Sequence, residues 1–89
     1  MLWSGNQISH HSVIMDHVFL GSQVAISGHC VVEPYSFLGI NSTVRENTRI
    51  REGTLVAMGA AVISDTEPWS VYKGIPARKS AESSRDFDT

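Results

Sequence analysis

The chain has 89 residues, enough for one small domain, and a core of this size is marginal unless repetition or oligomerisation adds stability. Its formal net charge of −2, from 7 Lys and Arg against 9 Asp and Glu, argues against a surface built for nucleic acid or anionic membranes. The single cysteine, Cys30, allows no intramolecular disulfide; with no signal-peptide pattern and no membrane-length apolar run, we expect a cytoplasmic protein.

From Ile8 onward the chain repeats every six residues. The first position of each block is always aliphatic: Ile8, Ile14, Leu20, Ile26, Val32, Leu38, Val44, Ile50, Val56 and Val62. Ten aliphatic residues in one fixed frame argue strongly against chance. An amphipathic helix needs apolar spacings of three and four instead, so the pattern predicts strands.

The later positions of each block indicate how the chain turns. The fifth is small or β-branched, as a cramped interior requires: Ser12, Val18, Val24, Cys30, Ser36, Ser42, Thr48, Thr54, Ala60 and Thr66. The fourth is rich in types that tolerate positive φ: His11, His17, Gln23, His29, Tyr35, Asn41, Asn47, Gly53, Gly59 and Asp65. Each block therefore predicts a short strand followed by a sharp corner.

Three blocks close a triangular coil of 18 residues, and successive coils stack at the strand spacing of about 4.8 Å. The blocks from Ile8 to Glu67 give a little over three coils with no inserted residue. Hexapeptide repeats of this kind are typical of the single-stranded left-handed parallel β-helix. We therefore predict this all-β fold, with three strands per coil.

The frame breaks at Pro68, after which Trp69 to Lys73 predict a closing strand. Residues 74–79 predict a turn that leads away from the coils. We expect one β-helix domain over residues 1–79, with hexads at 8–67 and the closing strand and turn at 68–79. The remaining residues, 80–89, are polar, and we expect them to form a flexible tail.

Several strings go beyond a generic repeat. They are Phe37-Leu38-Gly39-Ile40-Asn41-Ser42, Val56-Ala57-Met58-Gly59-Ala60-Ala61, Lys73-Gly74-Ile75-Pro76-Ala77-Arg78 and Ile8-Ser9-His10-His11. With them, residues 5–79 resemble the hexapeptide-repeat acyltransferases, above all the C-terminal domain of the sialic acid O-acetyltransferases and UDP-amino-sugar N-acetyltransferases. The resemblance implies transfer of an acetyl group from acetyl-CoA to an amino or hydroxyl group of a sugar-like small molecule.

The resemblance also implies catalytic residues. A histidine two positions after the first aliphatic residue of its block is the general base in that family, and here it is His10. Imidazole suits this role because its ordinary pKa lies near neutrality. Gly28 lies one coil later, where a backbone N–H can bind the developing oxyanion. His11 occupies the next position, where the family has an acidic residue that orients the base.

By the same resemblance, CoA would lie in a groove between neighbouring subunits of a homotrimer. Gly39, Ile40, Ala57 and Met58 would contact its pantetheine arm, and Lys73, Gly74, Ile75, Pro76 and Arg78 its adenosine phosphate end. Apolar residues that the pattern places outside could cover the subunit interface: Val13, Phe19, Val31, Phe37, Ile40, Leu55 and Met58.

Departures from the family pattern keep a second interpretation open. The chain has His11 in place of the acid, Phe19 at a second histidine position and Met58 where the family favours glycine. These 89 residues also do not encode the family's N-terminal nucleotide-sugar domain, so we expect a fragment of a longer protein, a partner that supplies the acceptor site, or a different acceptor. The alternative is therefore a structural or binding trimer, derived from such an enzyme, that has lost efficient catalysis. Neither interpretation calls for a metal, since no histidine pair has the spacing of the zinc-binding branch of this fold.

Overall fold

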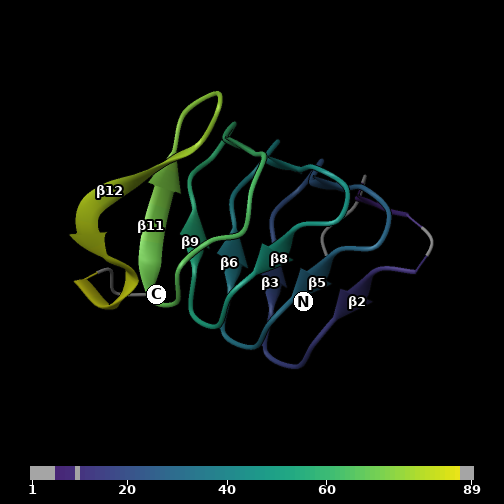
Figure 1. Ribbon diagram of the computed structural model, residues 1–89, viewed down its shortest axis with the longest axis horizontal. Coiled ribbons are helices and arrows are strands. Elements are labelled where there is room, and N and C mark those ends of the chain that lie inside the picture. The colour runs from purple at the N-terminus through teal and green to yellow at the C-terminus, as the bar shows by residue number, and fades with distance from the viewer. Residues whose placement is uncertain (1–5, 10, 87–89) are drawn as a thin grey trace.

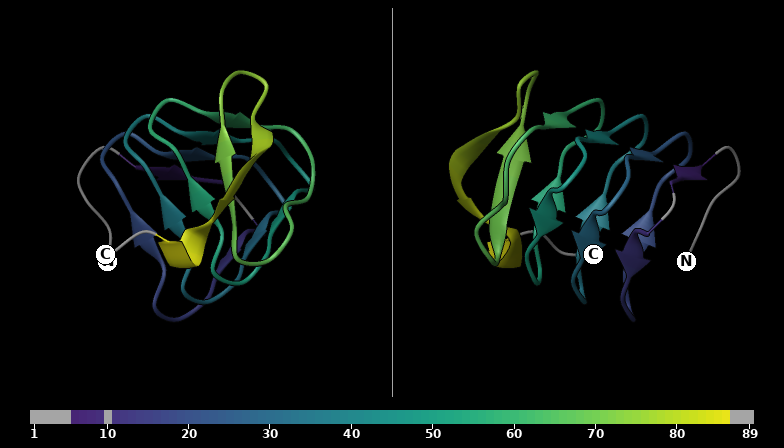
Figure 2. Two further views of the ribbon diagram at one scale, coloured as in Figure 1. Left: turned by 90° about the vertical axis from the view of Figure 1, so that its left-hand side faces the viewer. Right: turned by 45° about the vertical axis from the view of Figure 1, so that its right-hand side comes forward.

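The computed structural model describes residues 6–9 and 11–86, and the chain winds through them as a triangular prism (Figures 1 and 2). Ten two-residue strands form the coils: β1 Gln7–Ile8, β2 Val13–Ile14, β3 Phe19–Leu20, β4 Ala25–Ile26, β5 Val31–Val32, β6 Phe37–Leu38, β7 Thr43–Val44, β8 Arg49–Ile50, β9 Leu55–Val56 and β10 Ala61–Val62. The C-terminal part adds β11 Ser70–Lys73, β12 Arg78–Ser83 and a 3-10 helix, η1, over Ser84–Asp86. None of these elements is a helix long and apolar enough to cross a membrane.

The strands form three flat faces. The first face is β1-β4-β7-β10, the second is β2-β5-β8, and the third is β3-β6-β9-β11-β12. All pairs within the coils are parallel, and the register moves by 18 residues per coil, as in Gln7 to Ala25 and Phe19 to Phe37. The predicted triangular coil is therefore confirmed.

The core is a column of the first and fifth positions of the hexads. Eight first-position residues from Leu20 to Val62 are at most 2% exposed, while Ile8 in the first described coil is 38% exposed. The polar fifth-position residues from Ser36 to Thr66 are also buried, and several of them donate to main-chain carbonyls. Ser36 Oγ, for example, donates to Arg51 O at 3.1 Å. Small side chains with local acceptors thus fill an interior too narrow for large ones.

The corners fall where the sequence predicts them, with one exception. Nine of the ten fourth-position residues have positive φ, from His11 (64°) to Gly59 (75°). Asp65 does not, and Trp69 takes a positive φ of 56° instead. The last coil is shorter than the others, because Leu55 pairs with Val71, an offset of 16 residues instead of 18.

Side chains replace the missing strand of this short coil. Asp65 Oδ1 accepts a hydrogen bond from Arg49 N at 2.8 Å, and Thr66 Oγ1 accepts one from Arg51 N at 2.9 Å. Thr66 Oγ1 also lies 2.9 Å from Thr54 Oγ1 inside the core. The amide groups at the end of the second face are thereby satisfied without a further strand.

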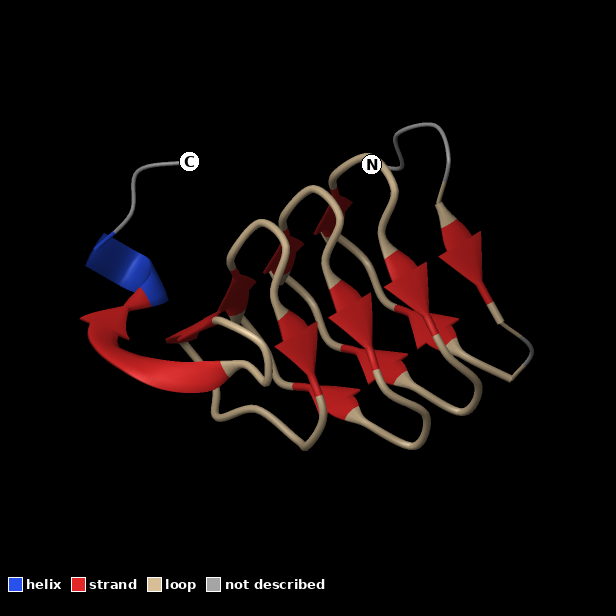
Figure 3. Cartoon of the chain, turned by 90° about the horizontal axis from the view of Figure 1, so that it is seen from above, coloured by secondary structure: helices blue, strands red, loops and turns tan. Residues whose placement is uncertain are grey.

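The C-terminal residues differ from the expected tail. The turn after β11 ends at Ala77, and residues 78–83 form β12, which pairs antiparallel with β11 and covers its outer edge (Figure 3). η1 then packs back toward β11, and Ser84 N donates to Trp69 O at 3.0 Å. Main-chain pairing drives this arrangement, and it leaves no apolar periodicity in the sequence.

Candidate functional site

Four predicted donor-binding residues lie together in one groove along the edge between the third and first faces. Gly39, Ile40, Ala57 and Met58 line it, and its volume is about 400 Å³. The other lining residues are Phe19, Gly21, Ser22, Phe37, Leu55 and Val56. We call this the donor groove. It runs along the prism, so an extended chain could follow it from coil to coil.

Glycine is required at the floor of the donor groove. A Cβ atom on Gly39 would lie 2.7 Å from Met58 N, and one on Gly21 would lie 2.9 Å from Ile40 N. Real Cβ atoms do not approach so closely, because the corner of the next coil passes directly over each glycine. The same closeness keeps the floor shallow. Met58 itself is 74% exposed, at the rim.

The residues predicted for the phosphate end lie at the C-terminal end of the donor groove, although they do not line it. Ala57 N donates to Tyr72 O at 2.9 Å, so Lys73, the last residue of β11, lies directly beyond the last coil. The turn between β11 and β12 contains Gly74, Ile75 and Pro76, and Figure 1 shows it projecting from the prism.

The basic groups at this end are engaged to different degrees. Lys73 Nζ lies 2.7 Å from Glu82 Oε1, and the hydrogen bond from Lys73, with a second one from Ser80, lowers the pKa of Glu82. Lys79 Nζ lies 2.9 Å from Glu67 Oε1, and this hydrogen bond raises the pKa of Lys79. Arg78 is exposed, and no ion pair involves it in the described part of the chain.

Two of the predicted catalytic residues, Gly28 and His11, belong to a different edge of the prism. His10 lies outside the described residues. Gly28 lies in the corner between β4 and β5, on the edge between the first and second faces, and Gly28 O accepts from Asn47 N at 3.0 Å. His11 is in the same edge and stacks on His29, with ring centroids 5.0 Å apart. Within one chain, the first face separates these residues from the donor groove.

The N–H of Gly28 forms no hydrogen bond with another described residue. Among hydrogen bonds between described residues, none uses the N–H of Gly28 or of the equivalent Ser22 and Ile40. The position is not free in every hexad, because the N–H of Glu52, at the same place in its block, donates to Glu33 Oε1 at 3.0 Å. What glycine adds at Gly28 is the absence of a side chain in front of it.

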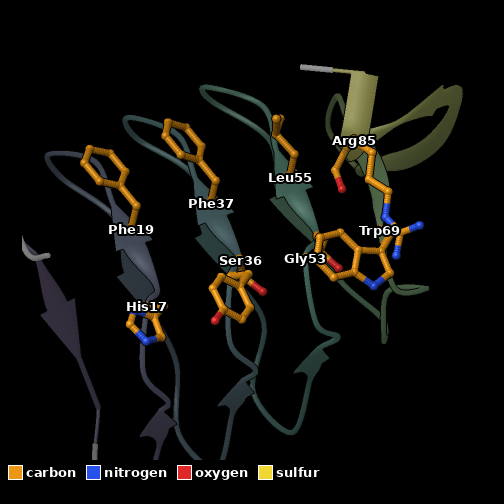
Figure 4. Close-up of a pocket in the computed structure, with 11 residues that line it drawn as sticks. His17, Phe19, Ser36, Phe37, Gly53, Leu55, Trp69 and Arg85 are labelled. Carbon is orange, nitrogen blue, oxygen red and sulfur yellow. The ribbon is translucent and has the colours of Figure 1, made fainter. Parts of the chain in front are cut away.

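A second and larger groove lies on the edge between the second and third faces, and the sequence analysis did not identify it. It has a volume of about 780 Å³. We call it the aromatic groove; Figure 4 shows its lining residues, which are His17, Phe19, Tyr35, Ser36, Phe37, Gly53, Thr54, Leu55, Trp69, Ser84 and Arg85. The repeat predicted only a corner for His17 and a closing strand for Trp69. The 16-residue offset of the last coil hides Trp69 from the 18-residue frame.

Ring stacking organises the aromatic groove. The rings of His17 and Tyr35 are parallel at 5.1 Å, and those of Phe19 and Phe37 at 4.7 Å. Trp69 packs its ring against Gly53, where any Cβ would collide with it. The guanidinium carbon of Arg85 lies 4.4 Å from the centre of the Trp69 ring. No three metal-ligating side chains come together in the part of the chain that the structure describes.

The chain has relatives of known function, although no family model matches it. UDP-3-O-acylglucosamine N-acyltransferase of Methylobacterium sp. (strain 4-46) is 34% identical over 83 residues, which cover 93% of this chain and 24% of that enzyme. Acyl-[acyl-carrier-protein]–UDP-N-acetylglucosamine O-acyltransferase of Paracoccus denitrificans is 27% identical over 83% of this chain and 28% of its own length. The chain thus spans about a quarter of the length of these relatives.

Solved structures agree. A crystal structure of UDP-N-acetylglucosamine acyltransferase superposes with a TM-score of 0.82 at 26% identity, over 83% of this chain and 29% of the other. An N-acyltransferase from Bacillus cereus, in complex with dTDP and coenzyme A, gives 0.62 at 14% identity, over 84% of this chain and 70% of the other. The predicted left-handed parallel β-helix is confirmed.

Proposed function

The homologues of this chain are acyltransferases built on the hexapeptide-repeat left-handed β-helix, and from this premise we propose that the chain transfers an acetyl group from acetyl-CoA to an amino or hydroxyl group of a sugar-like acceptor. The observation that supports acetyl-CoA as the donor is the donor groove. Four residues chosen from sequence alone line it, and three more of the predicted set, Gly74, Ile75 and Pro76, follow directly at its end.

In the proposed reaction, His10 takes the proton from the acceptor nitrogen or oxygen as that atom attacks the thioester carbonyl carbon. The N–H of Gly28 donates to the oxyanion of the tetrahedral intermediate. The carbon–sulfur bond then breaks, the sulfur takes up a proton, and the acetylated acceptor and CoA leave. The role of His10 rests on the resemblance, and that of Gly28 also on its open position one coil later.

The site is proposed to form between subunits of a homotrimer. The donor groove and Gly28 occupy different edges of one prism, so one chain does not bring a thioester in the donor groove to the N–H of Gly28. Contact between unlike edges of neighbouring chains would bring them together, and such a heterologous contact closes into a ring. Exposed apolar residues at the donor edge, Ile40 (47%) and Met58 (74%), would be covered in this contact.

The donor could also be presented on an acyl carrier protein, as the name of the Paracoccus relative states for that enzyme. Both donors end in a pantetheine thioester, which is the part that the donor groove would hold. Acetyl-CoA is the donor proposed here, because the proposed contacts at Lys73 and Arg78 need its adenosine phosphates.

Calorimetry with acetyl-CoA tests the proposal, together with an assay of thiol release in the presence of amino-sugar acceptors. We expect binding in the micromolar to millimolar range and loss of turnover, by about 100-fold or more, in His10→Ala. His29→Asn is the matched control, because Asn tolerates the positive φ of that corner. Full activity in His10→Ala would remove His10 from the mechanism. Binding of acetylated acyl carrier protein without binding of acetyl-CoA would reassign the donor.

One observation favours the alternative, a structural or binding trimer without efficient catalysis. The residue after His10 is His11, which stacks on His29 and brings no carboxylate to orient an imidazole. A trimer that shows no shift in melting temperature at millimolar acetyl-CoA, and that does not bind acetylated acyl carrier protein, would support this alternative.

A further inference from the structure

We propose that the aromatic groove is a nucleotide-binding site, in which a nucleobase stacks between Tyr35 and Trp69 and a phosphate is held by Arg85. The groove lies on a different edge from the donor groove and from Gly28, although Phe19, Phe37 and Leu55 on the third face line both grooves. The proposal therefore stands whether or not the chain transfers an acetyl group.

The first argument is the geometry of the rings. One face of the Tyr35 ring is covered by His17, and because the two rings are parallel within 6°, the other face points along the prism toward the next coil. That coil contributes Gly53, which has no side chain, and Tyr35 remains 56% exposed. Trp69 lies beyond Gly53. The groove thus has two aromatic residues, Tyr35 and Trp69, on neighbouring coils, with the Trp69 ring packed against Gly53, and a planar heterocycle could stack on these rings.

The second argument is charge. Arg85 lies over Trp69, and in the described part of the chain its guanidinium forms no ion pair, whereas Arg49, Arg51, Lys73 and Lys79 all do. A guanidinium in this position can bind a phosphate with two hydrogen bonds while it stays stacked on the indole. A purely apolar ligand would form no hydrogen bond with the Arg85 guanidinium.

The third argument is an unused hydroxyl. Ser84 lines the groove, and its Oγ atom is buried with no hydrogen-bond partner among the described residues. A buried polar atom of this kind is uncommon in folded proteins. A hydroxyl both donates and accepts, so it could bond to a ribose hydroxyl or to the edge of a base.

Size and shape agree with this class of ligand. A volume of about 780 Å³ falls within the range of about 300–1,000 Å³ that is usual for small-molecule sites. Phe19, Phe37 and Leu55 form one wall, which Figure 4 shows as a row beside the ring stack. Two molecules could bring a nucleotide here: an acceptor attached to a nucleotide, or the adenosine end of CoA, which would then lie here in place of the contacts proposed at Lys73 and Arg78. They share the same recognition chemistry.

Calorimetry at low salt distinguishes the two sources. UMP represents a nucleotide-linked acceptor, adenosine 3′,5′-bisphosphate represents the end of CoA, and uridine and adenosine lack the phosphate. We expect one of the nucleotides to bind, and its nucleoside to bind about 3- to 10-fold more weakly. The nucleotide that binds more tightly identifies the source.

Three variants locate the binding. Tyr35→Asn keeps a residue that accepts the φ of 64° but removes the ring, and it should weaken nucleotide and nucleoside alike by about 5- to 100-fold. Tyr35→His restores a ring and should recover most of the affinity. Arg85→Gln should abolish only the preference for the phosphate, and Arg45→Gln, an exposed arginine on another edge, should change nothing.

The proposal fails if neither nucleotide binds at millimolar concentration. It also fails if binding is unchanged in both Tyr35→Asn and Arg85→Gln while circular dichroism shows both variants folded. Absence of acetyl transfer, by contrast, leaves these measurements interpretable, because the Tyr35 and Arg85 variants assign the binding to the aromatic groove without any assay of turnover.

Discussion

Gly39 shows how closely neighbouring coils approach at the donor edge. Its Cα lies under the corner of the next coil, so a methyl group there would sit 2.7 Å from Met58 N. The glycine is therefore needed for packing in addition to any contact with a ligand. Because backbone cannot yield as a flexible side chain does, an added carbon must push two coils apart.

Gly39→Ala should lower the free energy of unfolding by about 1–3 kcal/mol, measured by urea denaturation. Gly59→Ala is the control, since its Cβ would meet no atom within 4 Å and only the positive φ of 75° opposes it. That strain should cost about 1 kcal/mol. Equal losses in the two variants would show that contact with Met58 is not the cause.

At the scale of elements, the C-terminal hairpin of β11 and β12 is held partly by an ion pair, whereas the core of the coils contains none of the ion pairs of the described residues. Lys73 on β11 bonds to Glu82 on β12, and Ser80 bonds to the same carboxylate oxygen. The folded pKa of Glu82 is therefore below its ordinary value of 4.5. A lowered carboxylate pKa stabilises the fold above the ordinary value, and this stabilisation disappears as the pH falls through the folded pKa.

Glu82→Gln should thus reduce the stability of the hairpin at pH 7 and have no effect at pH 2 to 3, where wild type is also uncharged at this position. The effect should be small because the pair is exposed and screened by salt. Melting temperatures of both proteins from pH 7 to pH 2.5 measure it, with Glu46→Gln as an exposed control. A difference that persists at the lowest pH would contradict the assignment to charge.

The elements also show what the sequence could predict. The hexad frame predicted all ten coil strands and nine corners, because each rests on a local residue type repeated in register. It failed at Asp65, because the last coil has 16 residues in place of 18. The residue types up to Asp65 still follow the hexad pattern, so the sequence does not signal the shorter coil before the frame has shifted. It could not predict β12 either, because main-chain bonds to an antiparallel neighbour need no particular side chains.

The candidate site divides in the same way. Gly39, Ile40, Ala57 and Met58 were predicted together because the family resemblance implied a donor site there, and the 18-residue coil brings them to one edge. The aromatic groove was not predicted, since Trp69 joins Tyr35 and His17 only through the shortened coil, and Arg85 returns to Trp69 only through β12 and η1. The repeat pattern cannot predict contacts that are formed by residues beyond the end of the repeat.

For the whole molecule, stability should vary along the prism axis. The C-terminal end is covered by β12, while Ile8 and Val13 in the first described coil are 38% and 49% exposed. Each coil touches only its neighbours, so local opening should begin at the less covered end. Hydrogen exchange should find the amides of Val13 and Met15 exchanging faster than those of Val31 and Glu33, two equivalent pairs one coil apart. Uniform protection along the axis would contradict this.

The short coil has a wider meaning for the size of the molecule. A stack made by one repeated translation has no intrinsic length, because every coil ends as the previous one did and can accept another. The 16-residue coil breaks that symmetry: it moves the chain out of phase, and the strand that follows receives an antiparallel neighbour instead of a further coil. Two missing residues thus act as a stop signal, and whole 18-residue units added before it would lengthen both grooves without altering how the stack ends.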